Sequence, residues 1–206
     1  MRRFRLYLLC FLALATSAAA QQRGLPSDEI SRQLGEWQKT YFNFNLKDFK
    51  TETAIRFEDI PFGTAAGLRN FYDIYKPALS FSPDGRQFID IYSYWLVLEK
   101  TGDKIVYNGG NQEQAVSWYD DNTRRWKRIL NVPAGDRVEE VAWLDSTHIL
   151  LAGSRRAADN DAHPLLWLGD LRSRRFIIFA NKNPACRQDK KGYDSPKLKA
   201  LHIVIK

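Results

Sequence analysis

The amino-acid sequence predicts a mainly β, antiparallel fold that contains two four-stranded units and one N-terminal helix. Three observations lead to this prediction: short apolar segments alternate with Asp-containing turns, this pattern is repeated along the chain, and one early segment has helical periodicity. The chain has 206 residues and 13% aromatic side chains. Without its first 20 residues, the chain has the length of one β-rich domain, residues 21–206. Such a domain is long enough to bury a core without disulfide bonds.

The two predicted units occupy residues 79–130 and 139–181. In each unit, a first hairpin consists of a strand, a tight turn with Asp84 or Asp145 at its centre, and a returning apolar strand. The corresponding segments are residues 80–85 with 141–146, and residues 88–93 with 149–154. Asp suits such turns because its side chain bonds to the backbone of the turn.

A second hairpin follows in each unit and completes four strands. Residues 116–130 correspond to residues 165–179, with Asp121 and Asp170 at the polar turns. Extra residues in the first unit fall at 95–110, where we expect them to lengthen a hairpin.

The run Leu-Ser-Phe-Ser-Pro-Asp-Gly-Arg-Gln-Phe at residues 79–88 resembles the signature of WD40-like repeats in TolB-type β-propellers. The tryptophan-containing second hairpins look like the outer strands of such blades. The resemblance implies two propeller-blade-like units and protein partners. Because a propeller usually has four to eight blades, two units could form a partial propeller, a sandwich, or a ring completed by other chains.

The N-terminal helix is predicted at residues 26–42, because the spacing of Ile30, Leu34, Trp37 and Tyr41 places them on one helical face. The remaining elements are shorter. They are a strand at 53–60, a loop at 61–67, an extended segment at 71–75, a long loop at 182–199, and a terminal strand at 201–205 that could pair with 53–60.

Residues 1–20 have the pattern of a secretory signal peptide: three early arginines, an apolar stretch at 6–15 and small residues at 17–20. The alternative is an uncleaved membrane anchor. A cleaved signal predicts a periplasmic or secreted protein with no transmembrane span after processing. Its removal takes away three arginines and no acids, which lowers the formal net charge from +7 to +4. This ordinary charge does not indicate nucleic-acid binding.

Cys186 would be the only cysteine of the mature chain. An unpaired thiol in an oxidising compartment is either buried or part of an intermolecular bond. Phosphate-binding glycine loops, Cys-x-x-Cys pairs and zinc-protease motifs are missing from the sequence. The three histidines, His148, His163 and His202, are scattered, and the Asp-rich residues 159–163 lack the glycine and distal glutamate of a calcium loop. We therefore predict no catalytic residue, cofactor or metal.

One group of charges forms a possible surface for an anionic partner, because it occupies equivalent positions in the two second hairpins. The group consists of Arg124, Arg125, Lys127, Arg172, Arg174 and Arg175. The alternative is that these cations keep the sheet edge soluble and prevent edge-to-edge pairing.

Three functions remain open. The first is an exported, non-enzymatic interaction or assembly module of the bacterial cell envelope. The second is a glycan or envelope-polymer binding module that uses exposed tryptophans. The third is a hydrolase whose acid and base would come from the turn aspartates Asp84, Asp90, Asp121, Asp145 and Asp170.

Overall fold

The computed structural model describes residues 25–158 and 160–205. The predicted signal segment at residues 1–20 lies outside the described residues. The described chain forms two five-stranded antiparallel sheets, a separate two-stranded sheet and a few short helices. The prediction of a mainly β, antiparallel fold is therefore confirmed.

Sheet I contains the strands of the second predicted unit. Its order is β1-β12-β11-β10-β9. The strands are β1 (Phe49–Arg56), β9 (Asp136–Trp143), β10 (His148–Arg156), β11 (Ala162–Asp170) and β12 (Arg175–Asn181). Strands β9 to β12 follow one another through hairpins, as predicted for residues 139–181. Strand β1 adds a fifth strand at the edge of β12, in a register that runs from Phe49 opposite Asn181 to Arg56 opposite Arg175.

Sheet II contains the strands of the first predicted unit, in the order β2-β8-β7-β4-β3. The strands are β2 (Ile60–Gly63), β3 (Ser80–Phe81), β4 (Gln87–Asp90), β7 (Gln114–Asp120) and β8 (Arg125–Val132). The extra residues form a separate two-stranded sheet of β5 (Leu96–Thr101) and β6 (Lys104–Gly110) and do not lengthen a hairpin of sheet II. The chain leaves sheet II after β4 because the backbone N–H groups of Tyr92 and Ser93 donate to the Asp90 carboxylate and form a turn there.

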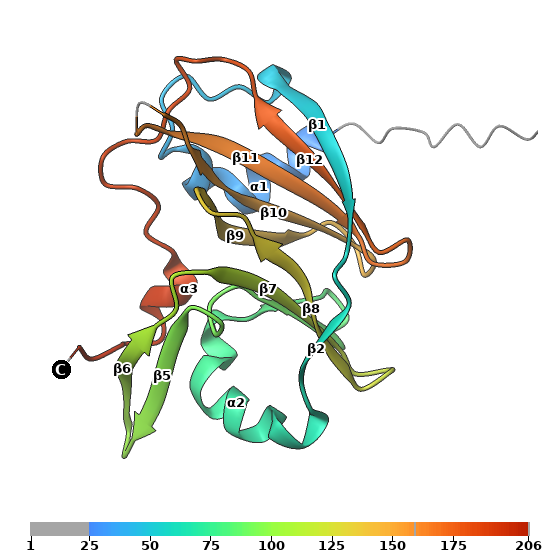
Figure 1. The fold of residues 1–206 in the computed structure, drawn as a ribbon, viewed down its shortest axis with the longest axis vertical. Coiled ribbons are helices and arrows are strands. Elements are labelled where there is room, and N and C mark those ends of the chain that lie inside the picture. The colour runs from blue at the N-terminus through green and yellow to red at the C-terminus, as the bar shows by residue number, and fades with distance from the viewer. Residues whose placement is uncertain (1–24, 159, 206) are drawn as a thin grey trace, which may run out of the picture.

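The two large sheets pack face to face over a shared hydrophobic core (Figure 1). Ile89 and Val116 of sheet II belong to the same buried cluster as Leu151 and Trp167 of sheet I. Gln114 also joins the sheets, because its side-chain amide donates to the Val138 carbonyl and accepts from the Val138 N–H, each at 2.8 Å. The two sheets are therefore joined by apolar packing and by this pair of hydrogen bonds.

A helix covers the outer face of each sheet. Helix α1 (Ser27–Gln38) buries Ile30, Leu34 and Trp37 in a second core cluster against sheet I. Helix α2 (Leu68–Tyr75) places Phe71 against sheet II, with its ring centroid 4.4 Å from that of Trp126. In Figure 1, α1 lies behind the strands of sheet I, and α2 lies on the side of sheet II that faces away from sheet I.

The prediction of an extended segment at residues 71–75 was wrong, because these residues end helix α2. Phe71 and Tyr72 follow Leu68 by three and four residues, and Tyr75 follows it by seven, so all four lie on one helical face that packs on the core. The helical period of 3.6 residues in the apolar positions is visible in the sequence only when the segment is extended back to Leu68.

The predicted strand at residues 53–60 is divided between the two sheets. Asp59 has a positive φ of 59° and lies between β1 and β2, so the chain crosses from sheet I to sheet II at this point. Part of the predicted loop at 61–67 accordingly belongs to β2. Three short 3₁₀ helices complete this region and its neighbours: Leu46–Asp48, Ala65–Gly67 and Lys76–Ala78.

The prediction of a terminal strand at residues 201–205 was also wrong. Only Val204 makes an isolated parallel bridge, with Val106 of β6, and the positive φ of His202, 47°, interrupts an extended conformation. The neighbour of β1 is β12 and not this segment. Helix α3 (Pro196–Lys199) occupies the end of the predicted loop at 182–199.

With 12 residues, α1 is the longest helix in the described part of the chain. None of the described helices combines the length and the apolar character that crossing a bilayer requires.

Candidate functional site

The six cations of the predicted basic surface lie at the hairpin turns and at the strand starts that follow them. Lys127 of β8 and Arg174, in the turn before β12, meet at Asp59, between β1 and β2. Arg174 Nη1 lies 3.1 Å from one Asp59 carboxylate oxygen, and the Lys127 ammonium contacts the other. The hydrogen bond from Lys127 lowers the pKa of Asp59, and the charges of Arg174 and Arg125 add to this effect. The structure thus brings three of the six cations around one carboxylate.

The other three cations are more separate. Arg175 stands directly opposite Arg56 in the β1–β12 pair, which places two like charges across from each other. Arg124 and Arg172 are exposed in the turns that precede β8 and β12. Within residues 25–158 and 160–205, neither of them forms an ion pair with a carboxylate.

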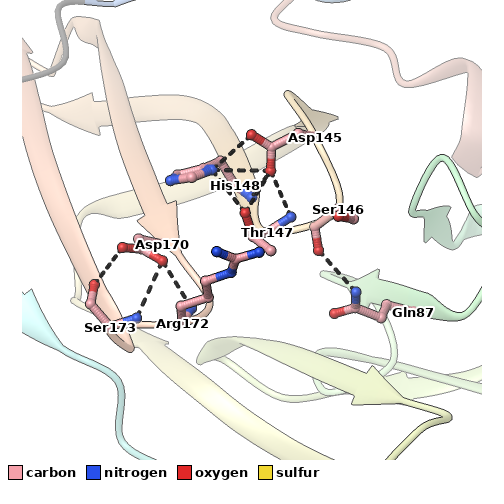
Figure 2. A network of polar contacts seen from close by, with 8 residues as sticks. All are labelled: Gln87, Asp145, Ser146, Thr147, His148, Asp170, Arg172 and Ser173. Atoms are coloured by element: carbon pink, nitrogen blue, oxygen red, sulfur yellow. Dashed lines mark hydrogen bonds and ion pairs between the residues drawn. The ribbon is translucent and has the colours of Figure 1, made fainter.

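Four of the five aspartates considered for a hydrolase, Asp84, Asp90, Asp145 and Asp170, accept hydrogen bonds within their own turns. Asp121 instead accepts from the Tyr119 hydroxyl at 3.2 Å, and the turn after β7 is held by Asp120, which accepts from the Asn122 N–H at 3.0 Å. Figure 2 shows Asp145 accepting from the backbone N–H of Thr147 at 2.7 Å and from that of His148 at 2.8 Å. Asp170 similarly accepts from the N–H of Arg172 at 2.9 Å and the hydroxyl of Ser173 at 2.7 Å.

Burial raises the pKa of Asp145, but the hydrogen bonds from Thr147 and His148 outweigh it and hold this pKa at about 2. Asp84 accepts from Ser82 and from the Arg86 N–H in the same manner. Asp90 is buried at the turn after β4, where desolvation raises its pKa. These carboxylates therefore stabilise turns, as the sequence pattern predicts for Asp.

A cleft lies where the segment 188–198 passes over sheet I. Its first hollow has a volume of about 440 Å³ and is lined by Tyr92, Trp95, Arg137, Glu139, Arg156 and Tyr193, among others. A second hollow of about 460 Å³ is lined by Asn111, Gln114, Asn131 and Pro133, among others. The two hollows share Trp95, Gly135, Asp136 and Arg137. We refer to both hollows together as the Trp95 cleft.

Trp95 and Arg137 stand together at the boundary of the two hollows. The Arg137 guanidinium lies 4.5 Å from the centroid of the Trp95 ring, a cation–π distance. The indole N–H of Trp95 donates to the Ile91 carbonyl at 3.0 Å, which fixes the orientation of the ring. The exposed Arg137 side chain is therefore held over an aromatic surface inside a cleft.

A β-bulge in β9 shapes the first hollow. Between β9 and β10 the register shifts, because Glu140 lies opposite Ala152 whereas Val138 lies opposite Gly153. The backbones are so close here that a Cβ on Gly153 would lie 1.8 Å from the Arg137 carbonyl oxygen. Bulges commonly redirect side chains beside binding sites.

The bulge presents two consecutive carboxylates, each with several partners. Glu139 accepts from the Trp37 indole N–H at 2.9 Å, the Tyr41 hydroxyl at 3.3 Å, and the side chains of Ser154 and Gln188 at 3.2 Å. Glu140 is buried, accepts from the Tyr193 hydroxyl at 2.8 Å and pairs with Lys197. These contacts hold α1 and the C-terminal segment on sheet I.

The acids and the cations of the first hollow differ in their partners. Asp136 forms two hydrogen bonds with the Arg155 guanidinium, at 2.7 and 2.8 Å, and Asp194 pairs with Lys199 at 2.6 Å. In contrast, Arg137, Arg156 and Lys191 are exposed and form no ion pair with any described residue. The cleft consequently has positive charge that its own carboxylates do not neutralise.

Four of the six tryptophans are core residues: Trp37, Trp126, Trp143 and Trp167. Trp118 is half-buried and donates to Gln87, so Trp95 is the half-buried tryptophan that reaches the cleft.

The Cys186 side chain is 0% exposed, and burial raises the pKa of its thiol to about 11. In the part of the chain that the structure describes, no three His, Cys, Asp or Glu side chains gather in a way that could hold a metal ion; Asp159 lies outside that part.

The sequence pattern does not identify Trp95, Arg137 and the two glutamates as members of one site. A local signal existed for the glutamates, because two consecutive acids interrupt the otherwise apolar run at residues 138–143 and so indicate a bulge. No family model, curated protein or solved structure matches this chain.

Proposed function

We propose that this protein is an exported, non-enzymatic binding module of the bacterial cell envelope, and that the Trp95 cleft holds its ligand. The observation that carries the proposal is the Trp95–Arg137 stack at the junction of two connected hollows. A small number of polar groups around an aromatic surface is the usual composition of a ligand site.

An oligosaccharide suits this composition. Its hydroxyls need hydrogen-bonding side chains, such as Asn111 and Gln112, and its ring faces suit an aromatic side chain such as Trp95. This favours a glycan or envelope polymer over a small apolar ligand.

The hydrogen bonds that Glu139 already accepts favour a binding function over hydrolysis. Its two carboxylate oxygens already accept hydrogen bonds from Trp37, Tyr41, Ser154 and Gln188. A general base must reach the proton that it removes, whereas Glu139 is held by α1 and by the C-terminal segment. We assign Glu139 the task of shaping the cleft.

Two further parts of the proposal come from the sequence. The signal-peptide pattern at residues 1–20 supports export to the periplasm or beyond. The repeated hairpins support kinship with the WD40-like repeats of TolB-type proteins, because sheet I contains the four consecutive antiparallel strands β9 to β12. In sheet II the corresponding strands are β3, β4, β7 and β8, with β5 and β6 inserted between the two hairpins. That resemblance favours a binding role.

The test is a titration of the isotope-labelled protein, from Gln21 onward, with neutral and acidic oligosaccharides, followed by amide and indole NMR resonances. We expect at least one oligosaccharide to shift the Trp95 indole resonance, which the variant Trp95→Phe identifies by its loss. The ligand should be recovered at its original length. Shorter fragments would contradict a non-enzymatic role, and shifts confined to the hairpin turns would contradict the location.

The predicted basic surface at the hairpin turns supports a second candidate function, the docking of an acidic protein. The observation that favours it is the pair Arg56 and Arg175, whose like charges would be relieved by an anionic partner. We expect the double variant Arg125→Glu, Arg175→Glu to abolish any binding of a labelled polyglutamate peptide in fluorescence anisotropy. Equal binding by the variant and the unmodified protein would exclude this surface.

A further inference from the structure

The two hollows of the Trp95 cleft differ in charge. The first hollow contains Arg156 and Lys191 in addition to Arg137, and its acids have partners of their own. Apart from Asp136 and Arg137, which line both hollows, the second hollow is lined by uncharged residues and by the exposed Glu113. Asp136 is paired with Arg155, so Glu113 supplies the negative charge of this hollow that no described cation pairs with. A ligand that fills both hollows would therefore meet cations at one end and mostly neutral groups at the other.

The second hollow has features that suit an uncharged sugar. Asn111, Gln112, Gln114 and Asn131 supply amide groups, and Val132, Pro133 and Ala134 supply apolar surface. The side-chain amide oxygen of Asn131 is buried without a hydrogen-bond donor among the described residues. Since an unpaired buried acceptor is costly, a hydroxyl or amide N–H of a ligand would stabilise it after a small rotation of the side chain.

Glu113 disfavours a second negative charge in this hollow. Like charges at short range repel, and this repulsion contributes to specificity. A chain that carries an acid on every sugar would place one carboxylate toward Arg137 and the next toward Glu113. A chain that alternates acidic and neutral sugars avoids this conflict.

We propose that the Trp95 cleft binds a linear oligosaccharide in which acidic and neutral sugars alternate, with one carboxylate at Arg137 and the following neutral sugar in the second hollow. This inference rests on the proposed function of the cleft. The guanidinium of Arg137 forms paired hydrogen bonds with a carboxylate while its flat face stays on Trp95.

Three tetrasaccharides of matched length test the charge pattern. A hyaluronan tetrasaccharide alternates glucuronate with N-acetylglucosamine, chitotetraose is neutral, and tetragalacturonate is acidic at every sugar. We expect calorimetry to show the tightest binding for hyaluronan, with an affinity that falls as salt is added. Tripolyphosphate serves as a competitor, and we expect it to displace hyaluronan only weakly.

The variant Arg137→Gln tests the position of the carboxylate. We expect it to weaken hyaluronan binding about tenfold or more, since it removes a charged hydrogen bond, and to leave chitotetraose binding unchanged. Arg69→Gln is the matched control, because Arg69 is exposed on α2, away from the cleft lining, and its loss changes the net charge equally. Circular dichroism of both variants confirms that they are folded.

The outcomes separate the inference from the proposed function. Tightest binding of chitotetraose at Trp95, without an effect of Arg137→Gln, would overturn the inference and leave the binding function standing. Tightest binding of tetragalacturonate would overturn the alternation of acidic and neutral sugars. Strong displacement of hyaluronan by tripolyphosphate would overturn the assignment of a saccharide as the ligand. If none of these ligands shifts the Trp95 indole, both proposals fail.

Discussion

Glu139 accepts hydrogen bonds from side chains in three separate parts of the chain. Trp37 and Tyr41 belong to α1 and the residues after it, Ser154 belongs to β10, and Gln188 begins the segment 188–198. A carboxylate suits this position because it accepts through both oxygens and donates nothing.

The variant Glu139→Gln should destabilise the protein although it preserves the size of the side chain. The new amide nitrogen is a donor, and it would face groups that also donate, so we expect a loss of about 1–3 kcal/mol in the free energy of unfolding. Urea unfolding measures this loss. Glu36→Gln is the control, since the Glu36 side chain is exposed at 73% and pairs with the exposed Lys39. Equal stability of the two variants would contradict the role of Glu139 in holding α1.

The low pKa of Asp145 predicts that the free energy of unfolding depends on pH in the acidic range. Its folded-state pKa of about 2 lies below the ordinary value of 3.8. The ionised carboxylate therefore stabilises the fold above about pH 4, and this contribution is lost as the pH falls toward 2. In Asp145→Asn, unfolding by urea should depend less on pH in this window than in the unmodified protein. An identical slope would show that Asp145 does not contribute.

Residue roles were predictable from the sequence where they depend on near neighbours. The turn aspartates accept from residues two or three positions away, so their pattern is local. Glu139 bonds to Trp37 across a separation of 102 residues. No local pattern contains that contact, which is why the sequence did not identify this site.

At the level of elements, the bulge in β9 connects the fold with the cleft. It sets the directions of Glu139 and Glu140 and brings the backbone of Arg137 close to Gly153 of β10. Glycine is needed at this position because any side chain would collide with backbone atoms, which cannot rotate away.

Two Gly→Ala variants distinguish this requirement from a general effect of glycine. We expect Gly153→Ala to lower the midpoint of thermal unfolding, because its Cβ would lie 1.8 Å from the Arg137 carbonyl oxygen. Gly35→Ala in α1 has no atom within 4 Å of the new Cβ, and its better helix propensity should stabilise by about 0.5–1 kcal/mol. Similar effects of both variants would exclude a special role for the bulge.

The hairpins were predictable because strand, turn and strand are consecutive in the sequence. Helix α2 was missed because the short segment at 71–75 omits Leu68, the residue that reveals the helical face. The C-terminal residues were assigned to a strand from their apolar character, but His202 adopts a positive φ that ends any extended run. The partner of β1 is not encoded locally, so the pairing with β12 required the structure.

At the scale of the whole molecule, both sheets have covered outer faces. Trp37 on α1 and Phe71 on α2 pack against the surfaces where a further blade of a propeller would lie. Completion of a ring by other copies would have to displace these helices. The face-to-face arrangement of the sheets suits both a sandwich and two neighbouring blades.

We therefore expect the chain from Gln21 onward to be a monomer by light scattering. The mass should be the same with and without reducing agent, because the Cys186 side chain is 0% exposed and cannot meet another thiol in the folded state. A discrete larger assembly would show that the helices do not prevent association, and a dimer that reducing agent dissociates would show that Cys186 becomes accessible.

The pairing of β1 with β12 determines when the protein can finish folding. Phe49 of β1 pairs with Asn181 of β12, so the five strands of sheet I can assemble only after almost the whole chain is available. The hairpins of each unit can form earlier, because their strands are close in the sequence. If the chain is exported N-terminus first, as the proposed signal peptide requires, β1 crosses the membrane long before β12. In that case sheet I would be completed on the far side of the membrane, and β1 would lack its β12 neighbour until then.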